Sequence, residues 1–403
     1  TKVFRFVCEL IEPVDGVVLQ HALEKTVEVF PLYRSILKKG LFWYYFEESS
    51  LRPEVFEENL PVCAPIYDAD KPCLLFRVSY YGKRINLEVF HALADGTGAL
   101  QFLRSMVFAY LAEMYGVPGR LPDYDVAVNQ KSLDAFYKYF DKKGKVPITK
   151  RYRPFRIRGE RWPNNRMSII EGFLSVGAVL KKAHEHHATL SEFLVALLMC
   201  SIYGEMAVRE QTRPVVVTVP VDLRRFFPAQ TARNFFGLIQ VTHNFHRDGQ
   251  DFEQVLVHVK QSFEQQLTKE YLQGIVSRYT ALENAPLIKA IPLLIKIPIL
   301  RLAGFWKDRE DTAAFSNVGC IVMPPEAAGY IRLFMSARRP QLCLCSFGDT
   351  LAVSVSSPLV DTGIQQRFFH SLADMGFSVQ VVSNLEQISG EEGFHASMRP
   401  LWN

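Results

Sequence analysis

Residues 84–103, RINLEVFHALADGTGALQFL, contain the most informative pattern in the sequence. Ile85, Leu87 and Val89 alternate with other residues, and this period of two predicts a β-strand. His91 follows at the end of that strand, where a rigid backbone can hold a side chain toward a cleft. A neutral imidazole there can take a proton from an attacking hydroxyl or amine, because the reference pKa of histidine is about 6.5.

The residues after His91 predict a tight turn followed by a helix. Asp95 and Gly96 form a common turn pair. Apolar residues then recur with helical spacing as far as Gly116, which is expected to end the helix, while Thr97 is the expected N-cap. The result is an H-x-x-x-D-G element between a strand and a helix. Such a hexad also occurs where the histidine simply packs in a core.

Working outward, both halves of the chain mix predicted strands with predicted helices. Strands are expected at 3–10, 34–37, 42–46, 74–80, 84–90, 214–221, 316–323, 341–347 and 351–356, and helices at 17–30, 98–115, 178–187, 193–203, 250–272 and 364–375. This pattern predicts an α/β or α+β layout that is repeated twice.

The length and composition indicate a folded protein with more than one core. A chain of 403 residues exceeds one ordinary core, and 48% hydrophobic with 22% charged residues excludes disorder for most of it. The net charge of +4 is too small to indicate a nucleic-acid partner. We expect one half at 1–140, a linker at 141–166 and a second half at 167–403.

The expected linker is the most basic part of the chain. Residues 138–166 hold five lysines and six arginines against only Asp141 and Glu160. Prolines interrupt regular structure there. A solvated crossover is the simpler interpretation, and the alternative is a landing site for substrate phosphates or for an acidic carrier protein.

The seven cysteines are scattered and show no C-x-x-C pair, so neither a disulfide framework nor a zinc site is expected. This favours a reducing, cytoplasmic location. His184, His186 and His187 lie among charged residues, which favours a solvated helix face over a metal site. No metal or redox cofactor is expected.

Residues 286–306, PLIKAIPLLIKIPILRLAGFW, raise the question of a membrane. The segment is long enough to span one, but Lys289, Lys296 and Arg301 interrupt it, as do two prolines. We predict a kinked, largely buried helix and no transmembrane segment. A surface-seeking amphipathic segment, with peripheral membrane contact, or the wall of a lipophilic channel is the alternative.

The hexad and several later motifs together resemble the HxxxDG acyltransferase superfamily, which includes chloramphenicol acetyltransferases, plant BAHD acyltransferases and the condensation domains of peptide synthetases. The similarity is greatest to bacterial proteins of the alcohol acetyltransferase family. It rests on PLYRSILKKGLFWYY (31–45), RINLEVFHALADGTGALQFL (84–103), VPVDLRRFF (219–227), ARNFFG (232–237) and FSNVG (315–319). The resemblance implies an α/β (α+β) sandwich of two tandem chloramphenicol-acetyltransferase-like subdomains, with an active-site channel between them.

The resemblance also assigns roles to particular residues. His91 matches the catalytic histidine. Asp95 matches an aspartate that holds the loop by pairing with an arginine, for which Arg224 is the best candidate and Arg225 the alternative. Gly96 is expected to permit the turn where a side chain would clash.

A late element, SNxG, is matched by Ser316, Asn317 and Gly319, near the expected interface of the halves. Ser316 or Asn317 is a candidate donor to an oxyanion, or a channel residue. The chain lacks the DFGWG element of BAHD enzymes, and Phe90 stands where many condensation domains carry a first histidine.

The implied activity is transfer of an acyl group from a thioester, either acyl-CoA or an acyl carrier protein, to an alcohol. An amine acceptor or a condensation-type reaction is the enzymatic alternative. A non-catalytic relative that binds a lipophilic ligand or a protein is the alternative of another class. Two tandem halves complete their own interface, so a monomer is favoured.

Overall fold

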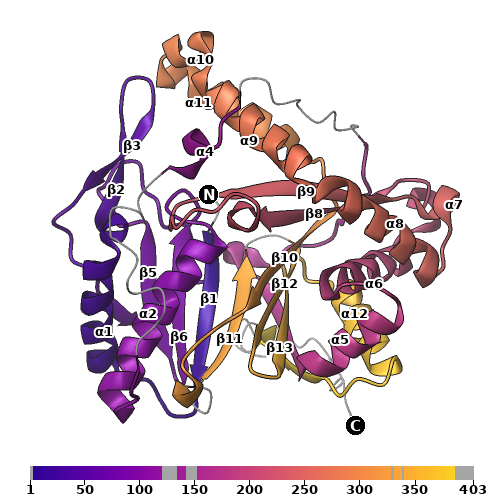
Figure 1. The fold of residues 1–403 in the computed structure, drawn as a ribbon, viewed down its shortest axis with the longest axis horizontal. Helices are drawn as coiled ribbons and strands as arrows, with labels where there is room; N and C mark the ends of the chain where they lie inside the picture. Colours follow the sequence, from indigo (N-terminus) through magenta and orange to yellow (C-terminus); the bar gives the residue numbers. More distant parts are fainter. Residues whose placement is uncertain are drawn as a thin grey trace.

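A computed structural model describes residues 3–119, 134–141, 152–307, 309–327, 331–337 and 340–385. In this part of the chain a five-stranded and a seven-stranded sheet lie side by side, with a separate two-stranded hairpin (Figure 1). Helices α1 and α2 cover the first sheet on its outer side, and α5, α6, α8 and α12 lie against the second. The predicted α/β architecture with two tandem parts is confirmed.

The first sheet is built from strands that are far apart in sequence. Its order is β11 (Ile331–Ala337), β1 (Val3–Leu10), β6 (Arg84–Phe90), β5 (Phe76–Tyr81) and β4 (Val55–Glu57). One face packs on α1 (Gly16–Val29) and α2 (Gly96–Tyr115), because the apolar stripes of both helices point at it.

The other face of this sheet carries a buried ionic ladder. Arg5, Glu88 and Arg77 stand opposite one another on β1, β6 and β5. Arg5 Nη2 and Arg77 Nη2 donate to the two oxygens of Glu88, at 2.7 and 2.6 Å, and Arg5 also pairs with Glu58. Glu88 further accepts a hydrogen bond of 2.6 Å from the backbone of Cys63. These charges can be buried because each is paired, and they hold the 58–64 loop on the sheet.

The second sheet lies wholly in the later part of the chain. Its order is β14 (Gln380–Ser383), β7 (Ser168–Ser175), β13 (Thr350–Ser357), β12 (Gln341–Phe347), β10 (Ala313–Cys320), β8 (Val215–Asp222) and β9 (Phe236–His243). Helix α6 (Leu190–Gly204) begins with the predicted capping box of Thr189 and Glu192. It is apolar almost all round because α8 (Phe252–Gln266) and α12 (Gly363–Asp374) pack against it.

The remaining elements are short or lie outside the two sheets. They are the hairpin β2 (Ser35–Lys39) and β3 (Tyr44–Glu48), the helices α4 (Ala135–Lys138), α5 (Val176–Glu185), α7 (Phe245–Asp248), α9 (Lys269–Asn284), α10 (Pro286–Ala290) and α11 (Leu293–Lys307), and 3-10 turns at Pro31–Arg34, Pro163–Asn165, Val208–Glu210, Leu223–Arg225 and Pro325–Ala327.

Strand β11 links the two parts, because it follows residue 167 in sequence but completes the first sheet. It pairs antiparallel with β1 from Phe4 to Leu10. The core beneath the first sheet also continues onto β12 and β13. The first sheet therefore cannot be completed by residues 1–140 alone, because its edge strand β11 comes from residues 331–337.

A buried carboxyl group lies where the two sheets meet. Glu171 on β7 faces Arg84 on β6, with Oε2 and Nη2 3.5 Å apart, and the same guanidinium lies 3.6 Å from Glu9. Burial raises the pKa of Glu171 to about 7; Arg84 opposes this shift and Glu9 adds to it.

Two predicted helix boundaries are wrong. The N-cap of α2 is Asp95, whose Oδ1 accepts a hydrogen bond of 2.9 Å from the backbone of Gly98, and Thr97 lies in the first turn. Gly116 ends the helix with φ of 65°, as expected. The helix expected over 250–272 is two helices, because the chain breaks at Leu267 and α9 starts anew with Thr268 as its N-cap.

The segment 286–306 forms α10 and α11, but the prediction that it is largely buried is wrong. Six large apolar side chains of α11 are exposed. Among the described residues no single helix is long and apolar enough to cross a membrane. Of the helices that the structure describes, one pair, α5 and α6, is long and apolar enough when taken together, and the two helices are bent by 82°.

Candidate active site

His91 lies at the end of β6, between the two sheets. The centroid of its ring is 5.0 Å from that of Phe4 on β1 and 5.4 Å from that of Phe236 at the start of β9. The side chain is half-buried. The imidazole therefore has one wall from each part of the molecule.

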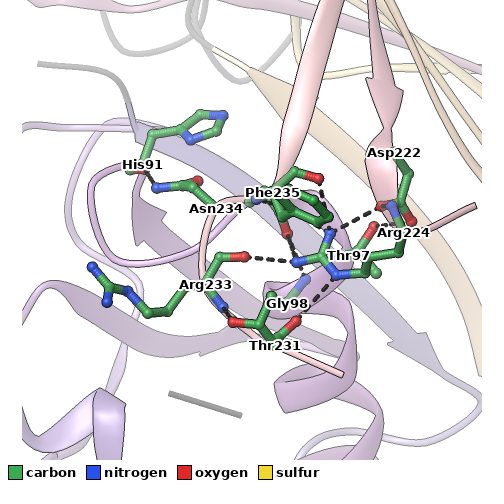
Figure 2. A network of polar contacts seen from close by, with 10 residues as sticks. His91, Thr97, Gly98, Asp222, Arg224, Thr231, Arg233, Asn234 and Phe235 are labelled. Carbon is green, nitrogen blue, oxygen red and sulfur yellow. Dashed lines mark hydrogen bonds and ion pairs between the residues drawn. The ribbon is translucent and has the colours of Figure 1, made fainter. Parts of the chain in front are cut away.

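The turn that carries His91 is held from the other part of the chain. Asn234 Nδ2 donates to the backbone oxygens of His91, at 2.8 Å, and Ala92, at 3.3 Å (Figure 2). Asn234 lies in the ARNFFG stretch, to which the sequence analysis assigned no residue role. Its amide ties the catalytic candidate to the loop before β9.

Asp95 is the anchor of the hexad. Its carboxylate accepts hydrogen bonds from Arg224 Nη1 at 2.9 Å, Arg224 Nη2 at 3.3 Å, the backbone of Phe235 at 2.8 Å and the backbone of Gly98 at 2.9 Å. Its side chain is only 5% exposed. These four bonds join the turn to Arg224 and to the backbone of Phe235, and they fit the predicted role of Asp95 in holding the loop.

Arg224 is the partner of Asp95, as predicted, and Arg225 is exposed. Arg224 also donates to Asp222 and to backbone oxygens of the 231–235 loop. Burial lowers the pKa of Arg224, but the attraction and hydrogen bonds of Asp95, and after them those of Asp222, outweigh burial and leave the pKa raised. The guanidinium is therefore a fixed cation between two carboxylates.

Asp222 completes the network. Its Oδ2 accepts a hydrogen bond of 3.2 Å from Thr97 Oγ1, and its Oδ1 accepts one of 3.1 Å from the backbone of Arg224. The start of α2 is thus joined to the end of β8 and the turn after it twice, through the Asp95–Arg224 pair and through the Thr97–Asp222 bond. Figure 2 shows Thr97, Asp222 and Arg224 together. The roles of Thr97 and Asp222 were missed because the pairing joins residues 125 positions apart.

The prediction that a side chain at position 96 would clash in the turn is wrong. A Cβ atom at Gly96 would meet none of the described heavy atoms within 4 Å, and its φ is outside the left-handed region. Gly98 is the constrained position, because a Cβ there would lie 2.0 Å from the backbone oxygen of Ala232. Gly98 lets α2 touch the 231–235 loop that Arg224 holds.

The SNxG residues lie on β10. Asn317 Nδ2 donates to Ser191 Oγ at 2.9 Å, and Asn317 Oδ1 accepts a bond of 2.8 Å from the backbone of Gly319, whose φ is 88°. These bonds form an irregular turn at the end of the strand. Ser316 is half-buried. An oxyanion or channel role for Ser316 and Asn317 remains a prediction.

The histidines of the 184–187 cluster lie on the surface around the end of α5, where His186 Nδ1 is 2.7 Å from Glu253. A different group, His243, Asp248 and His258, offers ligand atoms within 4.8 Å of one another. Both carboxylate oxygens of Asp248 already accept hydrogen bonds from Arg247, at 2.7 and 2.9 Å. We therefore assign no metal to it.

The basic linker is described only in part, since residues 142–151 lie outside the described ranges. Arg153, Arg156, Arg158 and Arg161 are exposed. One pocket, which excludes His91, lies between this segment, α6, α12 and the strands β12 and β13. Whether the arginines bind phosphates remains a prediction.

The architecture is that of two-subdomain chloramphenicol-acetyltransferase-like folds, which acyltransferases and condensation domains share. The chain is similar to TRI101 of F. graminearum complexed with coenzyme A and T-2 mycotoxin, at 11% identity, a TM-score of 0.63 and coverage of 94% of this chain and 96% of that one. It is also similar to polyketide synthase associated protein 5 from Mycobacterium tuberculosis, at 14% identity, a TM-score of 0.57 and 92% coverage of both chains.

The first condensation domain of the CDA synthetase is a third similar structure, at 15% identity, a TM-score of 0.53 and coverage of 91% of this chain and 89% of that one. No protein-family model and no curated protein matches the sequence. At these identities the comparisons establish the fold.

Proposed function

We propose that this protein is an acyltransferase that moves an acyl group from a thioester to a hydroxyl group, with His91 as the general base. One observation carries the proposal. A half-buried histidine stands between the two sheets, and its turn is fixed by Asn234 and by the Asp95–Arg224 pair. Such fixed placement of a base is what a reaction between two bound substrates requires.

The chemistry needs one base and one site for negative charge. His91 takes the proton of the acceptor hydroxyl while that oxygen attacks the thioester carbonyl carbon. The C–S bond then breaks, and the imidazolium returns the proton to the departing thiolate. General base catalysis of this kind contributes about 10²–10⁴ in rate. Ser316 or Asn317 is the proposed donor to the oxyanion, which is worth roughly 10²–10³.

Three features support the proposed substrates. The similar structure TRI101 was solved in complex with coenzyme A and either T-2 mycotoxin or deoxynivalenol. A further similar structure, TRI3, is a trichothecene 15-O-acetyltransferase. These names favour acyl-CoA as donor and a hydroxyl as acceptor. The exposed arginines at 153–161 fit the phosphates of coenzyme A or the acidic surface of an acyl carrier protein.

The test is release of free thiol from a panel of acyl-CoA donors with pooled alcohols and pooled amines. We expect release that depends on the acceptor and is lost in His91→Ala. His184→Ala is the matched control, because His184 is exposed on α5, and it should retain full activity. His91→Ala should keep its melting temperature, because the hydrogen bond that fixes its turn reaches the backbone oxygen of residue 91, which alanine retains.

Equal thiol release by wild-type protein and His91→Ala would rule out His91 as the base. If neither releases thiol, acyl-pantetheine and acyl carrier thioesters are the next donors. Silence with these as well would favour a protein of this fold that only binds ligands. A product that forms with amines but not with alcohols would move the assignment to an amide-forming enzyme.

A further inference from the structure

Helix α11 turns its apolar residues toward solvent. Ile295, Ile299, Leu302 and Trp306 are spaced by four, three and four residues, so they share one face. Each is between 56% and 61% exposed, and Leu294 beside them is 73% exposed. A helix that covers the core of a soluble protein has the opposite arrangement.

The orientation of α11 is fixed by its contacts with the turn between β2 and β3. The backbone of Leu293 donates to the oxygen of Leu41 at 2.8 Å. Lys296 is only 4% exposed, and its Nζ donates to the oxygen of Phe42 at 2.9 Å and lies 3.5 Å from the centroid of the Trp43 ring. The face of α11 that packs against the protein therefore carries Lys296, and this contact directs the apolar stripe of the helix toward solvent.

The same turn adds aromatic side chains to this surface. Leu41, Phe42, Trp43, Tyr44 and Tyr45 are between 37% and 69% exposed. Together with α11 they supply 11 of the 24 large exposed hydrophobic residues in the described part of the chain. Single exposed apolar residues are ordinary, but this concentration on two contacting segments is not. We name the six exposed residues of α11 and residues 41–45 the α11–hairpin patch. Figure 1 shows α11 beside the hairpin of β2 and β3.

The residues around the α11–hairpin patch are positively charged, which favours a negatively charged partner. Residues 285–307 contain four basic and no acidic residues, and Lys289, Arg301 and Lys307 are exposed. Two copies of such a surface would bring like charges together. An anionic lipid surface instead attracts the cations and accepts the apolar stripe, and tryptophan and tyrosine favour the boundary between lipid and water.

We propose that the α11–hairpin patch binds the surface of an anionic lipid bilayer, with α11 lying in the plane of the interface. The patch also adjoins the candidate active site. The rings of Tyr44 and Tyr67 lie 6.3 Å apart, and Tyr67 stacks on Phe90 at 5.7 Å, directly before His91. Delivery of a lipophilic acceptor from the bilayer to His91 rests on the proposed function, whereas membrane binding does not.

The test is co-sedimentation of the whole protein with vesicles of phosphatidylglycerol and phosphatidylcholine, compared with phosphatidylcholine alone. We expect binding that depends on phosphatidylglycerol and weakens in high salt. The double change Ile295→Glu with Leu302→Glu should reduce it at least tenfold. Arg301→Gln with Lys307→Gln should reduce it about fivefold per charge, and only on anionic vesicles.

Val257→Glu is the matched control, because Val257 is 50% exposed on α8, and its binding should equal that of the wild type. All changed positions are exposed, so the melting temperatures should stay equal. Leu294→Glu changes the most exposed residue of the α11–hairpin patch and should also weaken binding. Equal binding by wild type and the α11 variants would overturn the proposal, as would no binding to any vesicle. A dimer that Ile295→Glu with Leu302→Glu dissociates, measured by light scattering, would show a self-association surface instead.

Discussion

Replacing Arg224 by lysine tests whether the two parts of the molecule are joined by the geometry of a guanidinium or only by its charge. The Arg224 side chain makes six contacts, to Asp95 twice, to Asp222, and to three backbone oxygens of the 231–235 loop. A lysine keeps the charge but has three donors on one atom, so at least three contacts are lost.

The expected cost follows from these contacts. At about 1 kcal/mol net for each lost hydrogen bond, Arg224→Lys should lower the free energy of unfolding by about 3 kcal/mol. For 403 residues the entropy of unfolding is roughly 0.8 kcal/mol per kelvin, so the melting temperature should fall by about 3–4 °C. Acyl transfer should fall as well, because Asp95 and Phe235 are no longer held in place.

The assay is thermal unfolding beside Arg225→Lys, a matched change at the exposed neighbour, which should alter the melting temperature by less than about 1 °C. A double-mutant cycle with Asp95→Asn then isolates the pair, and the two changes should be non-additive by more than about 1 kcal/mol. Additive effects, or an Arg224→Lys protein as stable as Arg225→Lys, would refute the idea that the guanidinium of Arg224 joins the two parts of the molecule through Asp95.

Three further predictions concern single residues. Gly98→Ala should cost about 2 kcal/mol or more in thermal unfolding, because backbone must move, whereas Gly96→Ala should be neutral or slightly stabilising; similar melting temperatures would contradict this contrast. Asn234→Ala should lower kcat by about tenfold or more with little change in acceptor KM, since it holds the turn that carries the base; unchanged kcat would show that the amide is dispensable. The pKa of Glu171 is raised to about 7 from an ordinary 4.5, so its protonated form stabilises the fold below pH 4.5, and about 3 kcal/mol of this stability is lost as the pH rises to 7. Glu171→Gln should therefore melt at a higher temperature than the wild type at pH 8 but not at pH 4.5. A lower melting temperature of the variant at pH 8 would mean that the structure stabilises the charged carboxylate.

Local elements of the fold were predictable because they depend on neighbours in sequence. The alternation of Ile85, Leu87 and Val89 gave β6, the capping box at Thr189 gave the start of α6, and Gly116 gave the end of α2. The strands β4, β7, β9, β11 and β14 were not predicted. In β9 the sequence does carry a signal, because apolar Ile239 and Val241 alternate with polar Gln240 and Thr242.

The candidate site divides in the same way. The residue types of the hexad pointed to His91 as a base, the resemblance to a known family implied that Asp95 holds the loop, and the VDLRR motif offered two arginines. Which arginine reaches Asp95 depends on the side to which the turn after β8 directs each side chain. That Gly98 is the crowded glycine depends on the approach of a loop more than 130 residues away.

Hydrophobic periods, helix caps and the chemical groups of the hexad can be read from the amino-acid sequence, because they depend on residues a few positions apart. The completion of the first sheet by β11, the contact of Asp95 with Arg224 and the outward direction of the apolar stripe of α11 depend on long-range packing. The apolar pattern of 286–306 specifies a helix with a hydrophobic face, but not the direction of that face. In the folded chain the direction is set by Lys296, which is buried against Phe42 and Trp43 more than 250 residues away, and no spacing within the segment encodes that contact.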